Sequence, residues 1–349
     1  MQGLYLHVMM NDKFPSMPSD EDVNSDGYVF KDVFEVFNYI KSKGWDIGWY
    51  AAPHFEVMTL YDNHVVASPT PFSPLYRGQS SYYERCLPSL YRRKCSESQK
   101  LERLVQIEDF KTILNDNPEI KDEIEGGLAV NYIGLAQHYG IETNVIDMTN
   151  SFGVAAFFAT SDYDSLTHTY RPVMEIVRKG VIYFMPTGIF NFGPTLDNQV
   201  WPIGMEALAR PGEQRGFGAY LKENQDFHDI CPLKFFFWQN AQASIECQRR
   251  FGFGAALFPY DPMAEKVSIM RKYRIYGRDS IRKVVDENPE LGYDFQAAVD
   301  ALAADGCHIL DSTPFRYTKD ELNHITEQYH RKYPGSFPVE IVKNDYKNS

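Results

Sequence analysis

Residues 137–159 read QHYGIETNVIDMTNSFGVAAFFA and contain the clearest change from strand to helix in the chain. The apolar side chains of Asn144–Met148 predict a short buried strand, and the small and apolar run Val154–Ala159 predicts a helix packed against it. One of the polar residues 149–151 is expected to cap that helix. Polar side chains therefore stand where an apolar strand ends and a helix begins, which is where a cleft is usually lined.

Regular elements are predicted on both sides of this stretch. Upstream, apolar residues at helical spacing predict helices over 98–115 and from about 121 to Tyr139, with Gly140 as the C-terminal cap of the second. Downstream, the pattern predicts strands at 180–185 and 219–221, and helices at 263–274, at about 290–304 and after the capping-box sequence Thr318–Glu321. The connection 186–213 is rich in glycine, proline and aromatic residues, which predicts a long ordered loop.

The chain divides at a cluster of prolines within residues 69–74. Residues 1–70 are predicted to form an N-terminal extension rich in β-structure, for example at His64–Ala67. Residues 71–278 form the main domain, and residues 279–349 form a helical C-terminal extension whose polar end is expected to fray.

The composition indicates a globular protein. The 349 residues are 44% hydrophobic and 15% aromatic, which supplies ample side chains for a core. The formal net charge of −12 disfavours sequence-independent binding of long polyanions, although a local basic cleft is compatible with it. Basic clusters at Arg92–Lys94 and Gln248–Arg250 are interpreted as solvated faces.

The cysteines and the N-terminus indicate a cytoplasmic protein. The five cysteines are odd in number and show no Cys-x-x-Cys spacing, so neither a disulfide framework nor a zinc site is expected. The N-terminus lacks a basic region followed by an apolar stretch, and no apolar run approaches the roughly 18 residues of a membrane span. We expect no metal and no membrane partner.

Common enzyme signatures are absent from the sequence: it has no Walker loop, no His-Glu-x-x-His and no Gly-x-Ser-x-Gly. Three polar segments remain. In the first, Leu75–Ser80, Arg77 follows an apolar strand-like entry and precedes Gly78, which lets a ligand approach the backbone closely. The planar fork of arginine suits a phosphate or a carboxylate ligand. The alternative is that Arg77 forms a salt bridge with a nearby carboxylate, and the hexapeptide leaves both interpretations open.

The second segment is Leu135–Thr149. Gln137 and His138 end a predicted helix, while Asp147 and Thr149 end the next strand, so four polar groups can converge in space. The alternative is structural, because the helix dipole favours a histidine at a helix terminus. Asp147 can likewise orient that histidine or cap the backbone.

The third segment is Ala209–Phe217, which reads ARPGEQRGF. Taken alone, its mixed charges and two glycines indicate an exposed turn, with Glu213 in solvent. The segment gains significance only together with the other two.

In this order the three segments resemble the FRG domain of bacterial and phage-related proteins. The matching motifs are aromatic-Arg-Gly-Gln at Tyr76–Gln79, Gln-His-aromatic-Gly at Gln137–Gly140, Leu-Asp-x-Thr at Ile146–Thr149 and Arg-x-x-x-Gln-x-Gly at Arg210–Gly216. Residues 249–261 also resemble the closing helix of the family and its Leu-Phe-Pro-x-x-Asp turn. Asn144 departs from the arginine expected before the strand, which puts a phosphate contact there in doubt. The resemblance identifies residues 71–278 as an FRG domain.

The arrangement is also similar to the ADP-ribosyltransferase superfamily, which implies an α+β fold with a split β-sheet core and inserted helices. The similarity implies catalytic roles for Arg77, His138, and Glu213 or Gln214. It implies contacts with NAD for Arg77, Gly78, Gln79, Ser80, Tyr82, Tyr83, His138, Asp147, Thr149 and Arg210. A carboxylate, as at Glu213, can deprotonate the acceptor, whereas an amide, as at Gln214, can only position it. Glu213 therefore suits transfer chemistry and Gln214 suits the family pattern, and the sequence leaves the choice open.

The resemblance implies an NAD-dependent mono-ADP-ribosyltransferase, with NAD as co-substrate and without a metal. It implies a toxin or effector of a bacterial anti-phage defence or toxin–antitoxin system, with a protein or nucleic acid as acceptor and a neutralising antitoxin or partner. The alternative function is a non-catalytic sensor or adaptor module that binds a nucleotide or nucleic acid. A third possibility is hydrolysis of NAD, in which water replaces the acceptor.

Overall fold

The computed structural model describes residues 23, 27–45, 57–61, 64–68, 74–165, 168–175, 177–186, 200–203, 208–231 and 233–332. The polar C-terminal end that was expected to fray lies outside the described residues. None of the helices within the described ranges has the length and apolar character of a membrane span.

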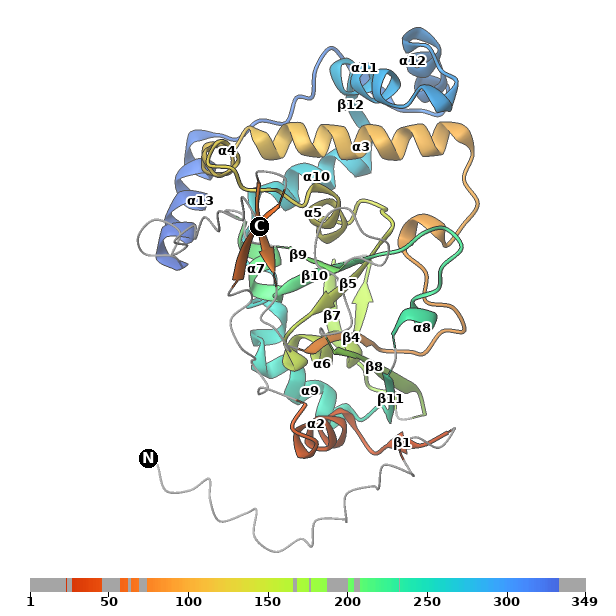
Figure 1. Ribbon diagram of the computed structural model, residues 1–349, viewed down its shortest axis with the longest axis vertical. Coiled ribbons are helices and arrows are strands. Elements are labelled where there is room, and N and C mark those ends of the chain that lie inside the picture. The colour runs from red at the N-terminus through yellow and green to blue at the C-terminus, as the bar shows by residue number, and fades with distance from the viewer. Residues whose placement is uncertain are drawn as a thin grey trace, which may run out of the picture.

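A seven-stranded mixed sheet forms the centre of the molecule (Figure 1). Its spatial order is β1 (Val29–Phe30), β11 (Leu233–Trp238), β8 (Lys179–Pro186), β4 (Pro74–Gln79), β5 (Val145–Thr149), β10 (Gly216–Tyr220) and β9 (Val200–Pro202). The β1–β11 pair is parallel, whereas the other neighbours are antiparallel. Two-stranded ribbons are formed by β2 (Val57–Tyr61) with β3 (His64–Ser68), β6 (Ser161–Asp164) with β7 (Thr169–Pro172), and β12 (Ile275–Gly277) with β13 (His308–Leu310).

The junction between β4 and β5 is the weakest in the sheet. Six residue pairs join β4 to β8 and five join β5 to β10, but a single pair, Tyr76 with Thr149, joins β4 to β5. The two strands therefore diverge beyond this pair, where β4 continues to Gln79 and β5 begins at Val145. This divergence leaves room for side chains between them.

Alternating side chains on the central strands build two cores. Tyr76, Ile182 and Phe184 face α2 (Val33–Ser42), α6 (Phe152–Ala159) and α9 (Ala241–Arg250). Leu75 and Tyr183 point to the other face, toward the short helix α8 (Phe227–Ile230).

Gly78 lets α6 cross β4 in direct backbone contact. A Cβ atom at this position would lie 1.8 Å from the carbonyl oxygen of Ala155, so any side chain is excluded. The glycine of the Tyr-Arg-Gly motif therefore has a packing role that the sequence interpretation did not give it.

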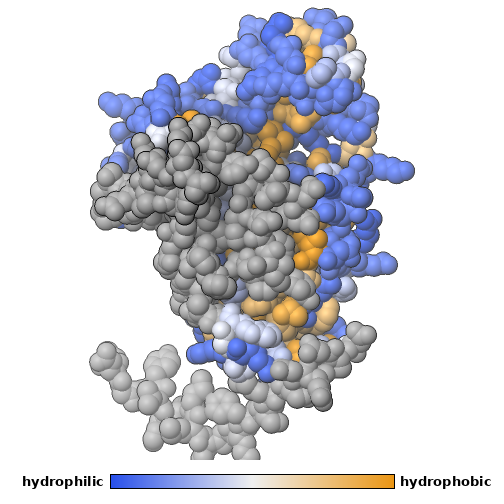
Figure 2. All heavy atoms as spheres, viewed as in Figure 1, coloured by the Kyte–Doolittle hydropathy of each residue, from blue (hydrophilic) through white to orange (hydrophobic). Residues whose placement is uncertain are grey.

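A second, helical layer is assembled around the long helix α3 (Glu97–Asn115), which Figure 1 shows across one end of the sheet. Its partners are α4 (Pro118–Glu125), α5 (Tyr132–His138), α10 (Pro262–Tyr273), α11 (Arg278–Glu287), α12 (Phe295–Ala304) and α13 (Lys319–Lys332). Hydrophilic residues predominate on the surface at the end that holds α11 and α12 (Figure 2), because the apolar faces of these helices turn toward α3.

The structure confirms the α+β class and most predicted elements. The helices at 98–115, 154–159 and 263–274 and the strands at 64–67 and 180–185 are present. Ser151 is the residue that caps α6, and Gly140 follows α5 with a φ of +84°. The capping box at Thr318 is formed by reciprocal bonds with Glu321.

Three predictions of secondary structure were wrong. The single helix expected over 121–139 is two helices, because Gly127 adopts a φ of +95° after α4 and Asn131 caps α5 anew. The described part of 186–213 holds β9 and α7 (Ala209–Gln214), so it is not merely a loop. The helix expected from about 290 begins at Phe295 with Asp294 as its cap, after a separate turn at Pro289–Leu291.

Several strands had no prediction. The ribbon strands β6, β7, β12 and β13 were missed. In the central sheet β11 was missed as well, and β1 comes from the segment predicted as an N-terminal extension. That segment also supplies α2, which packs on the sheet.

Replacing Asp109 with Asn is expected to flatten the pH dependence of stability. Asp109 on α3 is fully buried and accepts hydrogen bonds from Ser280 Oγ at 2.5 Å and from the Gly277 amide at 3.0 Å. Burial, partly offset by these bonds, raises its pKa from 3.8 to about 6. The fold therefore favours the protonated carboxyl, whose contribution is complete below about pH 4 and is lost as the pH rises through about 6.

Urea titrations at pH 4.5 and pH 7.5 measure this effect. Between the two, the free energy of unfolding of the wild type should fall by about 2 kcal/mol more than that of the Asp109→Asn variant. The same pH dependence in both proteins would contradict the prediction.

Candidate functional site

A large cavity opens where β4 and β5 diverge. Its volume is about 1360 Å³, above the ~300–1,000 Å³ of typical small-molecule sites. The lining comes from β4, the end of α5, β5, α6, the β6–β7 ribbon, α7, the turn at residues 258–261 and one face of α10. The cavity thus joins the three sequence segments that were expected to converge.

Most of the predicted site residues line this cavity. They are Arg77, Gly78, Gln79, Ser80, Tyr83, His138, Asp147, Thr149, Arg210 and Gln214. Glu213 is exposed on α7 and lies outside the lining. Tyr82 also lies outside it and instead stacks on His228, with ring centroids 5.1 Å apart. Of the two residues between which the sequence could not choose, the structure therefore brings Gln214 to the cavity.

Arg77 bridges the gap between the diverging strands. Its Nη1 donates a hydrogen bond of 2.8 Å to the backbone oxygen of Asp147 on β5. Its buried Nε has no hydrogen-bond partner among the described residues. Arg77 also forms no ion pair with the described residues, so none of their carboxylates neutralises its positive charge.

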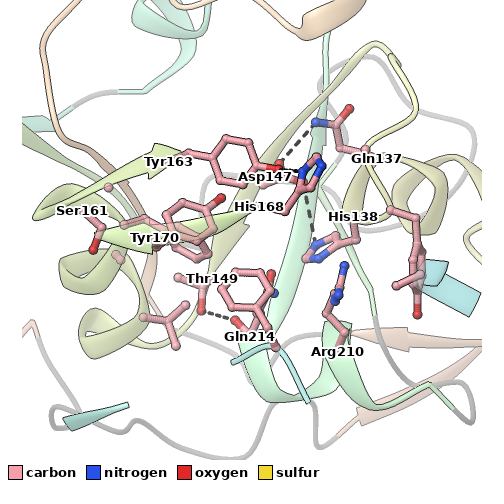
Figure 3. Close-up of a pocket in the computed structure, with 18 of the residues that line it drawn as sticks. Gln137, His138, Asp147, Thr149, Ser161, Tyr163, His168, Tyr170, Arg210 and Gln214 are labelled. Carbon is pink, nitrogen blue, oxygen red and sulfur yellow. Dashed lines mark hydrogen bonds and ion pairs between the residues drawn. The ribbon is translucent and has the colours of Figure 1, made fainter. Parts of the chain in front are cut away.

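Arg210 brings a second guanidinium to the cavity, and it too forms no ion pair with the described residues. Its guanidinium lies 5.8 Å from the ring centre of Tyr139 and 5.5 Å from that of Phe258, both within cation–π range. Nε of Arg210 is buried without a partner in the described ranges. Figure 3 shows the side chain pointing toward His138.

Arg271 on α10 is a third arginine in the lining. It approaches the chain so closely that a Cβ atom on Gly140 would lie 2.5 Å from its Nη1. As with the other two, the described residues supply no ion-pair partner for it. Guanidinium groups stay charged at all physiological pH values, so the three together favour an anionic ligand.

A polar cluster faces these arginines. Gln137 Nε2 donates to Asp147 Oδ2 at 3.3 Å, and Gln137 Oε1 accepts a hydrogen bond of 2.7 Å from Thr143 Oγ1. Asp147 Oδ1 lies 3.7 Å from His138 Nε2. Neither of these two atoms has a hydrogen-bond partner among the residues described. Figure 3 shows the three side chains converging from α5 and β5.

His138 is buried and neutral. Only 4% of its side chain is exposed. Burial lowers the pKa of His138 below its ordinary value of 6.5; the Asp147 carboxylate opposes this shift and Arg210 reinforces it. The imidazole fits because residue 216 is glycine, since a Cβ atom there would lie 2.6 Å from Nε2.

Thr149 and Gln214 hold the cavity wall together. Thr149 Oγ1 donates to the backbone oxygen of Gln214 at 2.9 Å and accepts from the amide of Ser151 at 3.1 Å. Gln214 Nε2 donates to the backbone oxygen of Leu257 at 3.0 Å. These bonds fix the end of β5 to α7.

Gln79 and Ser80 bond to neighbours at the far end of β4. Gln79 Oε1 accepts from Tyr183 Oη at 3.0 Å, and Ser80 Oγ donates to Asp162 Oδ1 at 2.9 Å. Asp162 also pairs with Arg178 at 2.6 Å, so its charge is compensated.

Aromatic side chains that the sequence interpretation missed line the rest of the cavity. Tyr170 and Phe258 stack with ring centroids 5.2 Å apart, and Tyr163 Oη lies 2.8 Å from His168 Nδ1. Tyr163 and Tyr260 are each more than half exposed. Such faces suit stacking on a planar ring. The turn at residues 258–261 was noticed as a family motif, but nothing in the spacing of the ribbon residues or of Arg271 indicated a site.

A family comparison supports the first part of this site. The FRG domain family model matches residues 73–167. This range contains β4, α5, β5 and α6, and ends before Arg210 and Gln214. No curated protein and no solved structure matches the chain.

The substitution Gly216→Ala is expected to displace His138 from its buried position. The added methyl group would overlap Nε2, and a more solvated imidazole loses much of the burial that lowers its pKa. The pKa of His138 should therefore rise toward 6.5, which a proton NMR titration of its Cε1–H measures. The exposed His330 provides a reference in the same spectra. An unchanged titration of His138 in the variant would show that the glycine does not control this environment.

Proposed function

We propose that the cavity binds NAD as a co-substrate and that the protein is an NAD-dependent mono-ADP-ribosyltransferase. The observation that carries the proposal is that three arginines without an ion-pair partner among the described residues share one cavity with exposed aromatic rings. A dinucleotide presents the matching groups, namely a pyrophosphate between two planar rings. The cavity of about 1360 Å³ is large enough for such a ligand.

The side chains divide into roles by their chemistry. Arg77, Arg210 and Arg271 would bind the pyrophosphate, since guanidinium groups form paired hydrogen bonds with phosphate oxygens. Tyr83, Tyr163 or Tyr260 would stack on the rings. Cleavage of the nicotinamide–ribose bond passes through an oxocarbenium-like state, and a ligand held at both ends is poised for it.

As part of the proposal, we relate the gap between β4 and β5 to the split core that the superfamily resemblance implies. A core of this kind exposes side chains of the first strand, here Arg77, beside the end of the second, here Thr149. Gln214 would take the ribose-binding place, because it is the member of the Glu-Gln pair that lines the cavity.

A second candidate function has its own supporting observation. Glu213, the carboxylate expected to activate an acceptor, is exposed outside the cavity. A module that binds NAD or another nucleotide without consuming it would need no such carboxylate. The proposal also includes what the sequence resemblance implies, namely a protein or nucleic acid as acceptor, a neutralising partner and a role in bacterial defence.

The substitution Arg210→Gln tests the proposal. Arg210 makes no hydrogen bond with the described residues, so its replacement should leave the fold intact. Loss of one charge-assisted contact should weaken NAD binding by about 10- to 100-fold, measured by calorimetry. Arg249→Gln is the matched control, because Arg249 pairs with Glu246 on the surface of α9.

Product analysis with labelled NAD separates the candidate functions. Release of nicotinamide with label on a protein, RNA or DNA acceptor supports the transferase, and free ADP-ribose alone indicates hydrolysis. Binding of intact NAD without turnover favours the sensor. No binding and no turnover by the wild type would overturn the proposal.

A further inference from the structure

We infer that Asp147 is the carboxylate that accepts the proton of the attacking acceptor, in the place that the sequence resemblance gave to Glu213. The inference rests on the proposed transferase function and deepens it. It starts from the carboxylates that line the cavity, which are Asp147, Asp162, Asp261 and Glu265.

Two of these carboxylates are already engaged. Asp162 bonds to both Ser80 and Arg178. Asp261 is buried, accepts a hydrogen bond of 2.5 Å from Tyr139 Oη and caps α10 through the amide of Met263. Both oxygens of Asp261 are therefore occupied by hydrogen bonds of the fold.

Glu265 is exposed on α10 and belongs to neither of the two strands, β4 and β5, that form the split. Asp147 is different because it stands on β5 directly beside the split. The backbone oxygen of Asp147 accepts the hydrogen bond from Arg77, which ties the residue to the centre of the proposed anion site.

The two oxygens of Asp147 have different surroundings. Oδ1 is buried, faces His138 Nε2 at 3.7 Å and has no hydrogen-bond partner among the described residues. The side chain as a whole is nevertheless 41% exposed. Among the described residues Oδ2 accepts a single bond, the 3.3 Å bond from Gln137 that orients it, so it is the oxygen that an acceptor in the cavity would meet.

His138 acts on this carboxylate as a positioning residue. Because burial keeps the imidazole neutral, it does not neutralise Asp147 in a permanent ion pair. A movement of less than about 1 Å would let an N–H at Nε2 donate to Oδ1, since hydrogen bonds of this type span about 2.7–3.2 Å. Proton uptake by Asp147 and this adjustment would then occur together.

The proposed step balances as follows. The O–H or N–H group of the acceptor approaches the C1 carbon of the nicotinamide-bearing ribose, and its heavy atom forms a bond to that carbon. The bond between the carbon and the nicotinamide nitrogen breaks, and its electron pair leaves with the ring, which departs neutral. The proton of the acceptor moves to Oδ2 of Asp147.

The test compares Asp147→Asn with wild type in the full chain. The amide keeps the shape of the side chain but cannot accept the proton, and general-base catalysis contributes about 10²–10⁴-fold. With adenylate-labelled NAD and separate protein, RNA and DNA acceptor pools, transfer should fall at least about 100-fold. NAD binding by calorimetry should stay within about threefold of wild type, since about 0.6 kcal/mol corresponds to that factor.

A matched variant keeps the result interpretable. Asp122→Asn removes an exposed carboxylate on α4 and should change neither measurement.

Three results would overturn the inference. They are transfer by Asp147→Asn within about threefold of wild type, loss of NAD binding together with transfer in that variant, or a loss of transfer in Glu213→Gln equal to that expected for Asp147→Asn. A wild type that neither binds nor consumes NAD would instead show that the proposed function itself has failed.

Discussion

The structure depends on the single residue pair that joins β4 to β5. Each of these strands is firmly paired on its other side, so the sheet holds together as two halves that meet at Tyr76 and Thr149. Beyond that pair the backbone groups of the two strands lack each other as partners, and the Arg77 guanidinium supplies one donor across the gap. The cavity exists because the halves separate at this point, while α6 stays seated on β4 through Gly78.

Buried polar and charged groups without hydrogen-bond partners lower the stability of a fold, and several of them line this cavity among the described residues. Buried Nε atoms of Arg77 and Arg210 lack partners, as do His138 Nε2 and Asp147 Oδ1. Each unsatisfied buried group costs about 1–3 kcal/mol, more when it is charged. A ligand-binding role predicts unpartnered polar groups on a cavity, and four such atoms line this one, although the described residues leave others unpartnered elsewhere, for example on Asn117, Gln239 and Gln248. Some buried charges elsewhere are paired, as Lys266 is with Glu321.

Sequence reasoning predicted a set of residues that the structure brings to one cavity, because these residues stand at the ends of elements. His138 ends a helix and Asp147 belongs to a strand with a clear apolar pattern, so their proximity followed from one short connection. The sequence could not decide between Glu213 and Gln214. Adjacent side chains on a helix point in directions about 100° apart, and only the packing of α7 decides which of them faces the cavity. The Arg-x-x-x-Gln-x-Gly motif does not say which of these two side chains faces the cavity.

The parts that sequence reasoning missed depend on contacts between distant segments. β1 is two residues long, and it is a strand because it pairs with β11, which lies some 200 positions later in the sequence. Arg271 lies on a well-predicted helix, but the face it presents to Gly140 is set by the packing of α10 against α3. The break between α4 and α5 had a local signal in Gly126 and Gly127, which the apolar periodicity obscured.

The cavity contains both positively charged side chains and a carboxylate. Arginines from β4, α7 and α10 contribute positive charge, whereas the carboxylate of Asp147 stands beside a neutral imidazole. If His138 were protonated, it would bind Asp147 as an ion pair and cancel the negative end. Burial behind Gly216 prevents this by disfavouring the charged imidazole, so the same packing that positions the ring also keeps the carboxylate available. A ligand with a negative centre, as the pyrophosphate of NAD is, would be held by the arginines before any group on it reacts, while the carboxylate stays available for the acceptor.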